Sequence, residues 1–314
     1  MATFPIAATK AVTNVAASPA YSGVFIPEIW TGKLLEKFYD STVLNAIANT
    51  DYTGEIKNQG DTVKIRIRPD IEIITYEADM AIAVERPSVA GIDLEINQGR
   101  YFAAILDDVM DIQSDINLMS TWSEEASERM KINIDSYVLG TLAAGISTDN
   151  KGATAGRLSN NIALGVTGTR LDVVARNPGA GEVEVIDLIL RLAQVLDEQN
   201  IPETGRWLVV PSWFAAMVKR SELRDASLTG DGTTMLRNGR LGMIDRFTLY
   251  SSNLAPSGEI LAGHSHGLTF ASQLTKMETI RSEATFGNIL RGLQVFGSKV
   301  VDGKSLAVAY ATAA

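Results

Sequence analysis

The chain has 314 residues, of which 46% are hydrophobic and 21% are charged, and its formal net charge is −9. These values are ordinary for a globular protein with a sizeable core. They argue against long disorder and disfavour a general nucleic-acid binder, which needs a cationic surface against the phosphates. The absence of cysteine excludes disulfide bonds and thiolate chemistry, and no apolar run approaches the roughly 18 residues of a membrane-spanning helix.

Residues 1–24 contain mainly Ala, Thr, Ser and Val, with Lys10 as their single charged side chain. They are expected to form an N-terminal arm that has no core of its own and lies on something else or stays disordered. A secretion signal is disfavoured, because Lys10, Asn14 and Pro19 interrupt the apolar stretch and no basic segment precedes it. A first helix is expected over residues 27–49, since proline suits the first turn of a helix.

Residues 51–97 follow the period of β-strands. Over residues 61–69, hydrophobic side chains alternate with cationic ones, which gives the strand two faces of opposite character. Further extended runs are expected at residues 71–75 and 92–97. A hairpin is only marginally stable alone, so this β-rich excursion is expected to pack on another body, for which a second copy of the chain is a candidate.

Cationic side chains gather in the same excursion, and two interpretations of them stay open. They line a solvated strand face, or they form salt bridges to acidic patches on a neighbouring subunit, which would select partner and register more than affinity. The residues predicted to make these inter-subunit contacts are Lys57, Lys64, Arg66, Arg68 and Arg86.

The longest helical pattern runs over residues 118–144, and at about 1.5 Å per residue it would span about 40 Å. Its apolar positions recur every three or four residues, which predicts one buried stripe. The stripe consists of Trp122, Ala126, Met130, Ile134, Tyr137 and Thr141. Residues 145–182 are rich in Gly, Asn and Thr and indicate a domain boundary after the helix.

The second half of the chain mixes helices and strands. Helices are predicted at residues 183–199 and 212–222, with a buried strand at 206–211 between them. A strand that enters a turn is predicted at 241–253, and the sequence from Gly263 onward is mostly strand-like. Because this order lacks regular βαβ alternation, the fold class is predicted to be α+β.

Two patterns raise the question of metal binding. Asp107, Asp111 and Asp115 recur every four residues, as if to place three carboxylates on one helix face. Oxygen-ligand sites usually have tighter, loop-borne spacing, so acid at a helix N-terminus or in a solvated loop is the favoured interpretation. His264 and His266, the only histidines, are too few for a catalytic zinc site. No metal and no cofactor is predicted.

The segment GHSHG at residues 263–267 matches the letters of the G-x-S-x-G nucleophile elbow of α/β-hydrolases, with Ser265 as the nucleophile. That fold needs a triad histidine well downstream of the serine, whereas the only later histidine is the adjacent His266. The match is therefore interpreted as a coincidence, and no catalytic residue is predicted.

Four segments follow one another in an order that carries a resemblance. They are LDDVMDIQSD (106–115), directly before the long helix that contains Asp135; LAQVLDEQNIPETGRWLVVPSWF (192–214); NGRLGMIDRFTLYSSNL (238–254); and ILAGHSHGLTFASQ (260–273), followed by RSEATFGNILRGLQVFGSKVV (281–301). With the arm, the excursion and the long helix before them, the chain resembles the major capsid protein family of tailed bacteriophages, whose fold is shared with encapsulins and with the herpesvirus capsid floor.

This resemblance implies an α+β fold with a defined division of the chain. The implied parts are an N-terminal arm (1–24), a peripheral domain (25–146) with an extended loop (about 51–95) and a spine helix (about 118–144), an axial domain (147–275), and C-terminal strands (276–314) that return to the peripheral domain. In this family the arm and the extended loop reach across neighbouring subunits. Because the arm is short, the N-terminal scaffolding segment that some relatives carry is not expected, and a separate scaffolding protein or none is expected in its place.

The resemblance also implies the function. The expected protein is a non-enzymatic subunit that self-assembles into the pentamers and hexamers of an icosahedral shell, built in the host cytoplasm, which becomes the capsid of the virion. The shell would enclose double-stranded DNA without sequence-specific binding and would not involve a membrane; scaffolding, portal and decoration proteins are candidate partners. An encapsulin-like nanocompartment shell and a serine hydrolase using Ser265 stay as alternatives.

Overall fold

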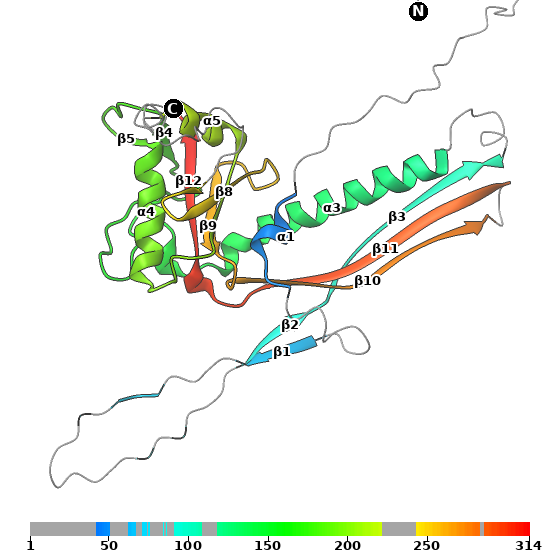
Figure 1. Ribbon diagram of the computed structural model, residues 1–314, viewed down its shortest axis with the longest axis horizontal. Coiled ribbons are helices and arrows are strands. Elements are labelled where there is room, and N and C mark those ends of the chain that lie inside the picture. The colour runs from blue at the N-terminus through cyan, green and yellow to red at the C-terminus, as the bar shows by residue number, and fades with distance from the viewer. Residues whose placement is uncertain are drawn as a thin grey trace, which may run out of the picture. The chain divides into compact units, whose positions relative to one another are not determined.

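The computed structural model describes residues 42–50, 62–66, 71–73, 75, 84, 86, 91–108, 118–221, 243–282 and 286–314 (Figure 1). All of these residues belong to one compact unit that spans residues 38–314. The predictions for the arm at 1–24, for Lys57 and Arg68, and for the first helix up to residue 41 lie outside the described residues.

Helices and strands follow one another in mixed order along the described residues. The helices are α1 (Leu44–Ile47), α3 (Leu118–Gly145), α4 (Val185–Glu198) and α5 (Ser212–Arg220), with 3-10 turns η2 (Thr148–Asn150) and η5 (Gly303–Ser305). The strands are β1 (Thr62–Arg66), β2 (Gly91–Glu95), β3 (Gln98–Asp107), β4 (Leu171–Val174), β5 (Glu182–Glu184), β6 (Arg206–Val210), β7 (Met243–Ile244), β8 (Phe247–Ser251), β9 (Glu259–His264), β10 (Leu268–Arg281), β11 (Gly287–Val300) and β12 (Leu306–Ala313).

The larger sheet has seven strands in the order β5-β4-β12-β9-β6-β8-β7, with parallel and antiparallel neighbours. Its central strands are apolar on both faces, as expected for strands that are covered twice. One set of alternating side chains packs with α4 and α5 into the first core. The opposite set, which includes Trp207, Val209 and Val308, packs with the C-terminal half of α3 into the second core.

The smaller sheet has three long antiparallel strands in the order β10-β11-β3, which run alongside the N-terminal half of α3 (Figure 1). Successive side chains of a strand point to opposite faces. Phe102, Met277 and Gly292 line a cavity of about 420 Å³ together with Ser127 and Met130 of α3, so their face is the one turned toward the helix.

Strands β1 and β2 form a separate antiparallel hairpin in which Lys64 lies opposite Asp93 and Ile65 opposite Ile92. Its apolar face rests on one end of the smaller sheet, where Ile65 and Leu94 pack with Val295. The approach is close, since a Cβ on Gly297 would lie 2.3 Å from the carbonyl oxygen of Glu95. This glycine therefore sets how near the hairpin comes.

The two sheets meet at a junction crowded with backbone. A Cβ on Gly303 would lie 2.5 Å from the carbonyl oxygen of Gly145, where α3 ends. The buried side chain of Asn150 donates to the carbonyl oxygens of Lys304 and Leu306 at 2.7 and 2.8 Å and accepts from Gln199, the residue after α4, at 3.0 Å. These hydrogen bonds connect the segment that follows α3 to the segment that follows β11, and both segments to the larger sheet.

Most elements expected from the sequence are confirmed, and their bounds shift by a few residues. The helix predicted at 118–144 is α3, the helix at 183–199 is α4, and the strand at 206–211 is β6. The α+β fold class is confirmed. The strand expected at 241–253 is two strands, β7 and β8, joined at Asp245 and Arg246, whose positive φ angles of 43° and 68° suit a tight hairpin turn.

The structure departs from three expectations for the described residues. Residues 71–73 and 75, part of the extended run expected at 71–75, lie in no strand, although an unpaired segment can still be extended. Thr141 of the predicted stripe is exposed, whereas Ile134 of the stripe is buried together with Val138, Leu139 and Leu142, which the predicted stripe did not include. The stripe shifts because only the C-terminal half of α3 lies between two apolar layers.

The third difference concerns the last strand. β12 pairs with β9 and β4 in the larger sheet, so residues 276–314 do not return together to one place. The sequence LAVAYATA is apolar at nearly every position, which suits a strand covered on both faces rather than one with a solvated side. The remaining domain boundaries stay predictions.

Candidate functional site

The cationic residues predicted for inter-subunit contact fall mainly on the hairpin. Lys64 and Arg66 lie two positions apart on the exposed face of β1, while the intervening Ile65 is buried. Arg86 is also exposed. The hairpin face thus carries the alternation that the sequence predicts, but Lys64 has Asp93 directly opposite on β2, so the face holds both signs of charge.

A more continuous surface lies on the side of the smaller sheet turned away from α3, and we call it the outer face. Its positions form three rows across the strands: Lys276, Leu293 and Tyr101; Glu278, Arg291 and Ala103; and Ile280, Ile289 and Ile105. Tyr101 is 80% exposed, Ile105 43% and Leu293 39%. An ion pair between Arg291 and Glu278 separates the isoleucine row from the row that contains Leu293 and Tyr101.

Among the described residues, the β1–β2 hairpin covers this face only at its Val295 end. Large apolar side chains that stand together in water are typical of a surface that a partner covers. The outer face was missed by the sequence analysis because the apolar run at 101–106 shows no strand alternation. The signal that could have found it is a run of six apolar residues without charge or proline, followed by Asp107.

Asp135, in the middle of α3, is an interior anchor rather than a metal ligand. Its carboxylate is 3% exposed and accepts hydrogen bonds from the backbone N–H groups of Val43, at 2.6 Å, and Leu44, at 3.3 Å. Burial raises the pKa of Asp135 above its usual value, and the two backbone hydrogen bonds act in the opposite direction. The side chain joins α1 to the long helix.

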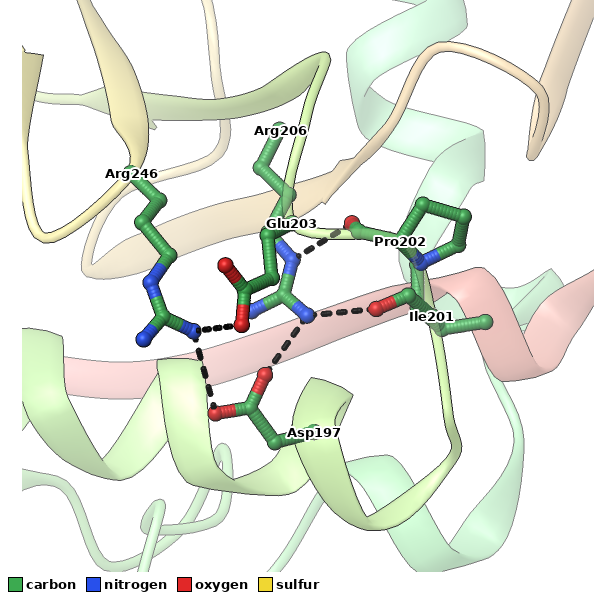
Figure 2. A network of polar contacts seen from close by, with 6 residues as sticks. All are labelled: Asp197, Ile201, Pro202, Glu203, Arg206 and Arg246. Carbon is green, nitrogen blue, oxygen red and sulfur yellow. Dashed lines mark hydrogen bonds and ion pairs between the residues drawn. The ribbon is translucent and has the colours of Figure 1, made fainter.

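A second anchor is the buried Arg206 at the start of β6 (Figure 2). Its guanidinium donates to the carbonyl oxygens of Pro202 at 2.9 Å and Ile201 at 2.6 Å, and to Asp197 of α4 at 2.6 Å. Arg246 of the β7–β8 turn lies 3.8 Å from Asp197 and 2.7 Å from Glu203. The network holds the connection from α4 to β6 and the neighbouring hairpin in place, which is an architectural role.

The GHSHG segment has the wrong structure for a nucleophile elbow. The elbow is a sharp turn from a strand into a helix, whereas in this chain His264 ends β9, a turn follows, and Leu268 begins β10. His264 and His266 do not share a strand face, because His266 lies in the turn and donates its backbone N–H to Nδ1 of His264 at 3.1 Å. The hydrolase alternative therefore loses its structural basis.

His264 is nevertheless tied into the junction between the sheets. Burial lowers its pKa below the usual histidine value, with help from the neighbouring charges of His266 and Arg206, while a hydrogen bond to the backbone of Thr204 acts the other way. Protonation of Nδ1 would remove the acceptor for His266 N–H. The neutral imidazole is the form that fits the fold.

The acidic triplet is not brought together on one helix. Asp107 is the last residue of β3, and Asp111 and Asp115 lie outside the described residues. In the described part of the chain, no group of three or more His, Asp or Glu side chains is placed to hold a metal ion. No helix among the described segments is long and apolar enough to cross a membrane.

Sequence comparison relates the chain to one protein family. A family described as phage capsid protein matches residues 94–309, which is more than half of the 314 residues. Among curated proteins, none matches the chain. Many solved structures match it.

Three of these solved structures come from different phages. A structure from Mycobacterium phage Che8 is 22% identical, covers 91% of this chain and 97% of its own, and has a TM-score of 0.69. The capsid of the cyanophage P-SCSP1u is 15% identical, with 92% and 94% covered and a TM-score of 0.66. The mature capsid of bacteriophage PhiM1 is 13% identical, with 91% and 92% covered and a TM-score of 0.65.

Proposed function

The chain belongs to the phage capsid protein family and has the role of a major capsid protein, and on this premise we propose that its copies form the pentamers and hexamers of an icosahedral shell around double-stranded DNA. The observation that carries the proposal is the outer face. Tyr101, Ile105 and Leu293 stand exposed in the single subunit, and a shell covers such side chains by placing subunits against each other.

The charge of the chain agrees with a container for nucleic acid. A net charge of −9 favours an enclosing surface that does not grip the phosphates. We therefore propose no sequence-specific contact to the DNA. Assembly in the host cytoplasm, with scaffolding, portal and decoration proteins as partners, belongs to the same proposal.

The division of the chain is proposed in a revised form. The smaller sheet, α3 and the hairpin form the peripheral part with the extended loop, and the larger sheet with α4 and α5 forms the axial part. The revision moves β12 into the axial part, because its pairing partners are β9 and β4. Lys57, Lys64, Arg66, Arg68 and Arg86 are proposed to contact acidic groups of a neighbouring subunit.

The test is assembly of the chain expressed alone and with candidate scaffolding proteins, followed by size-exclusion chromatography and electron microscopy. We expect closed shells or ring-shaped capsomers, and DNA in shells that form in an infected host. A compact monomer under every condition would overturn the proposal. Closed shells that carry a protein cargo in place of DNA would favour the encapsulin-like alternative.

A further inference from the structure

One turn contacts two other segments at the junction between the sheets. Residues 264–267, which we call the joint turn, connect β9 of the larger sheet to β10 of the smaller sheet. The N–H of Ser265 donates to the carbonyl oxygen of Gly205, just before β6, at 3.4 Å. The carbonyl oxygen of Gly267 accepts from the N–H of Val301, just after β11, at 2.9 Å. The joint turn therefore links the connection from α4 to β6 with the segment that follows β11.

The shape of the joint turn depends on an unprotonated Nδ1 atom in His264. This atom accepts the backbone N–H of His266 at 3.1 Å, and the carbonyl oxygen of His264 accepts from Gly267 at 2.9 Å. The other ring nitrogen is left to donate to the backbone of Thr204, in the connection from α4 to β6. A proton on Nδ1 would set two donors against each other at the bond to His266. One neutral imidazole thus holds both the turn and the neighbouring connection.

The positive charges near His264 disfavour a further cation at this position. Arg206 of β6 lies directly opposite His264 in the pairing of β6 with β9, and its side chain is fully buried. Burial, together with the positive charges of His266 and Arg206, holds the pKa of His264 below its usual value. A proton on His264 would therefore add positive charge beside an arginine that has no access to water.

The acidic side chains on the surrounding elements already have other partners. Asp197 of α4 bonds Arg206 at 2.6 Å, and Glu203 forms an ion pair with the arginine of the β7–β8 turn at 2.7 Å (Figure 2). On the segment after β11, the carboxylate of Asp302 accepts from the backbone N–H two residues further on, at 3.0 Å. Among the described residues, none of these carboxylates pairs with His264, so the charge of a protonated ring would stay uncompensated.

We propose that the joint turn is an acid-sensitive connection between the two sheets, which opens when His264 takes up a proton. Opening breaks the bond from the N–H of His266 to the ring, and the bonds of the turn to Gly205 and Val301 are lost with it. The change is local, because α4, β6 and β9 keep their contacts in the first core. The connection belongs to the single subunit and acts whether or not copies of the chain assemble.

Hydrogen exchange of the full-length chain, measured by mass spectrometry at about pH 7.5 and about pH 5.5, tests the proposal. These values lie one unit on either side of the usual histidine pKa of about 6.5. Protection is the exchange rate of a peptide in the unfolded chain divided by its rate in the folded chain, which removes the pH dependence of the exchange chemistry. The open turn has the ordinary pKa and binds the proton first as the pH falls, which favours opening by up to about tenfold at the lower pH.

We expect the protection of a peptide over residues 262–268 to fall by about this factor between the two pH values. A peptide over residues 299–303 should lose protection with it, because Val301 is bonded to the turn. A peptide over residues 188–196 of α4 is the internal reference and should not change. Loss at the turn without loss at 299–303 would overturn the proposed link between the segments.

The two histidines of the chain can be separated by substitution, because there are no others. His264→Asn keeps an acceptor near the position of Nδ1 but does not titrate, so it should keep the protection of the turn at the lower pH. His266→Gln, at an exposed position of the same turn, should lose protection like the unsubstituted chain. An unchanged acid loss in His264→Asn, or none in His266→Gln, would overturn the inference. A turn whose protection does not depend on pH in the unsubstituted chain would do the same.

A second measurement covers the case in which His264→Asn fails to fold. In the His266→Gln chain the remaining histidine ring signal in a proton NMR spectrum belongs to His264, so its titration is observed directly. We expect a midpoint below the usual value of about 6.5, and a midpoint at or above that value would overturn the inference. Neither measurement needs assembled particles, so failure of the proposed function would leave both results readable.

Discussion

The larger and the smaller sheet differ in how many of their faces the chain covers. The seven-stranded sheet lies between α4 and α5 on one side and the C-terminal half of α3 on the other, and side chains such as Leu208 and Val209 are fully buried. The three-stranded sheet has α3 on one side, while Tyr101 and Leu293 on the other side stay exposed.

The difference shows where stability and assembly reside. Burial of apolar surface within the subunit stabilises the fold of the subunit, so substitutions in the larger sheet should lower the free energy of unfolding. Apolar side chains on the outer face add little until a neighbour covers them, so substitutions there should act on assembly. Substitutions in the two regions test this division. Their expected effects on the free energy of unfolding of the subunit range from several kcal/mol to almost none.

The largest effect is expected for Phe214→Ala in α5. Phe214 is fully buried in the first core, and loss of such a ring lowers the free energy of unfolding by about 3–5 kcal/mol. Urea unfolding of the unassembled subunit measures it. Leu190→Ala, at a half-exposed position on α4, is the control and should cost far less; equal effects would contradict a sealed core.

A somewhat smaller loss is expected for Arg206→Met. It removes the donors to Ile201 and Pro202 and leaves their carbonyl oxygens unpaired, so the free energy of unfolding should fall by about 3 kcal/mol. Arg246→Ala is the matched control, because Arg246 is 46% exposed in the same network and exposed ion pairs contribute about 0–1 kcal/mol. Denaturant midpoints of both variants would show the ranking, and the reverse order would refute it.

The junction between the sheets should respond to one added methyl group. Gly303→Ala places a Cβ 2.5 Å from the carbonyl oxygen of Gly145, and such overpacking costs about 1–3 kcal/mol. Gly99→Ala in β3 serves as the control, since a Cβ there meets nothing within 4 Å. Thermal unfolding compares the two variants. If the backbone at the junction can shift to make room for the methyl group, the two variants will have equal melting temperatures, which would contradict the prediction.

The pH dependence of stability should contain a contribution from His264. Because burial lowers its pKa in the fold, the unfolded chain binds a proton first as the pH falls below about 6.5. The free energy of unfolding should therefore decrease from about pH 6.5 downward until the folded pKa is reached, and change no further below it. Thermal unfolding of the unsubstituted chain and of His264→Gln between pH 7.5 and pH 5, a range set by the usual histidine pKa of about 6.5, isolates this part as the difference between the curves. Parallel curves would show that His264 does not contribute.

The smallest effect on the subunit is expected for Leu293→Thr. Leu293 is 39% exposed, and surface substitutions usually change the free energy of unfolding by no more than about 0.5 kcal/mol. Assembly should nevertheless be lost, as measured by sedimentation of particles. A large drop in subunit stability with assembly retained would reverse the roles assigned to the two sheets.

Local pattern was enough to predict some elements. The helix at α4 has apolar side chains at helical spacing, and β6 is a short uninterrupted apolar run before Pro211. The hydrophobic pattern of each segment predicts its structure, because one face of α4 and both faces of β6 pack against other elements of the same subunit. The sequence alone also carried the fold class and the resemblance to capsid proteins, since these depend on the order of such elements.

Other features could not be read from local pattern. Strand β3 was missed because its run of apolar residues has no alternation, and the buried stripe of α3 was misplaced because burial depends on which half of the helix lies over the larger sheet. The letters of GHSHG matched a nucleophile elbow, which is a turn from a strand into a helix. The tertiary structure places the segment between strands β9 and β10, so it is not such an elbow.

The sequence by itself determined which segments are helical or extended, because side-chain period and turn residues act over a few neighbours. The tertiary structure alone decided which apolar faces are covered within the subunit. Coverage depends on contacts between residues far apart in the chain, such as the pairing of Leu293 with Tyr101 that creates the outer face. The proposed assembly surface is what those distant contacts leave uncovered.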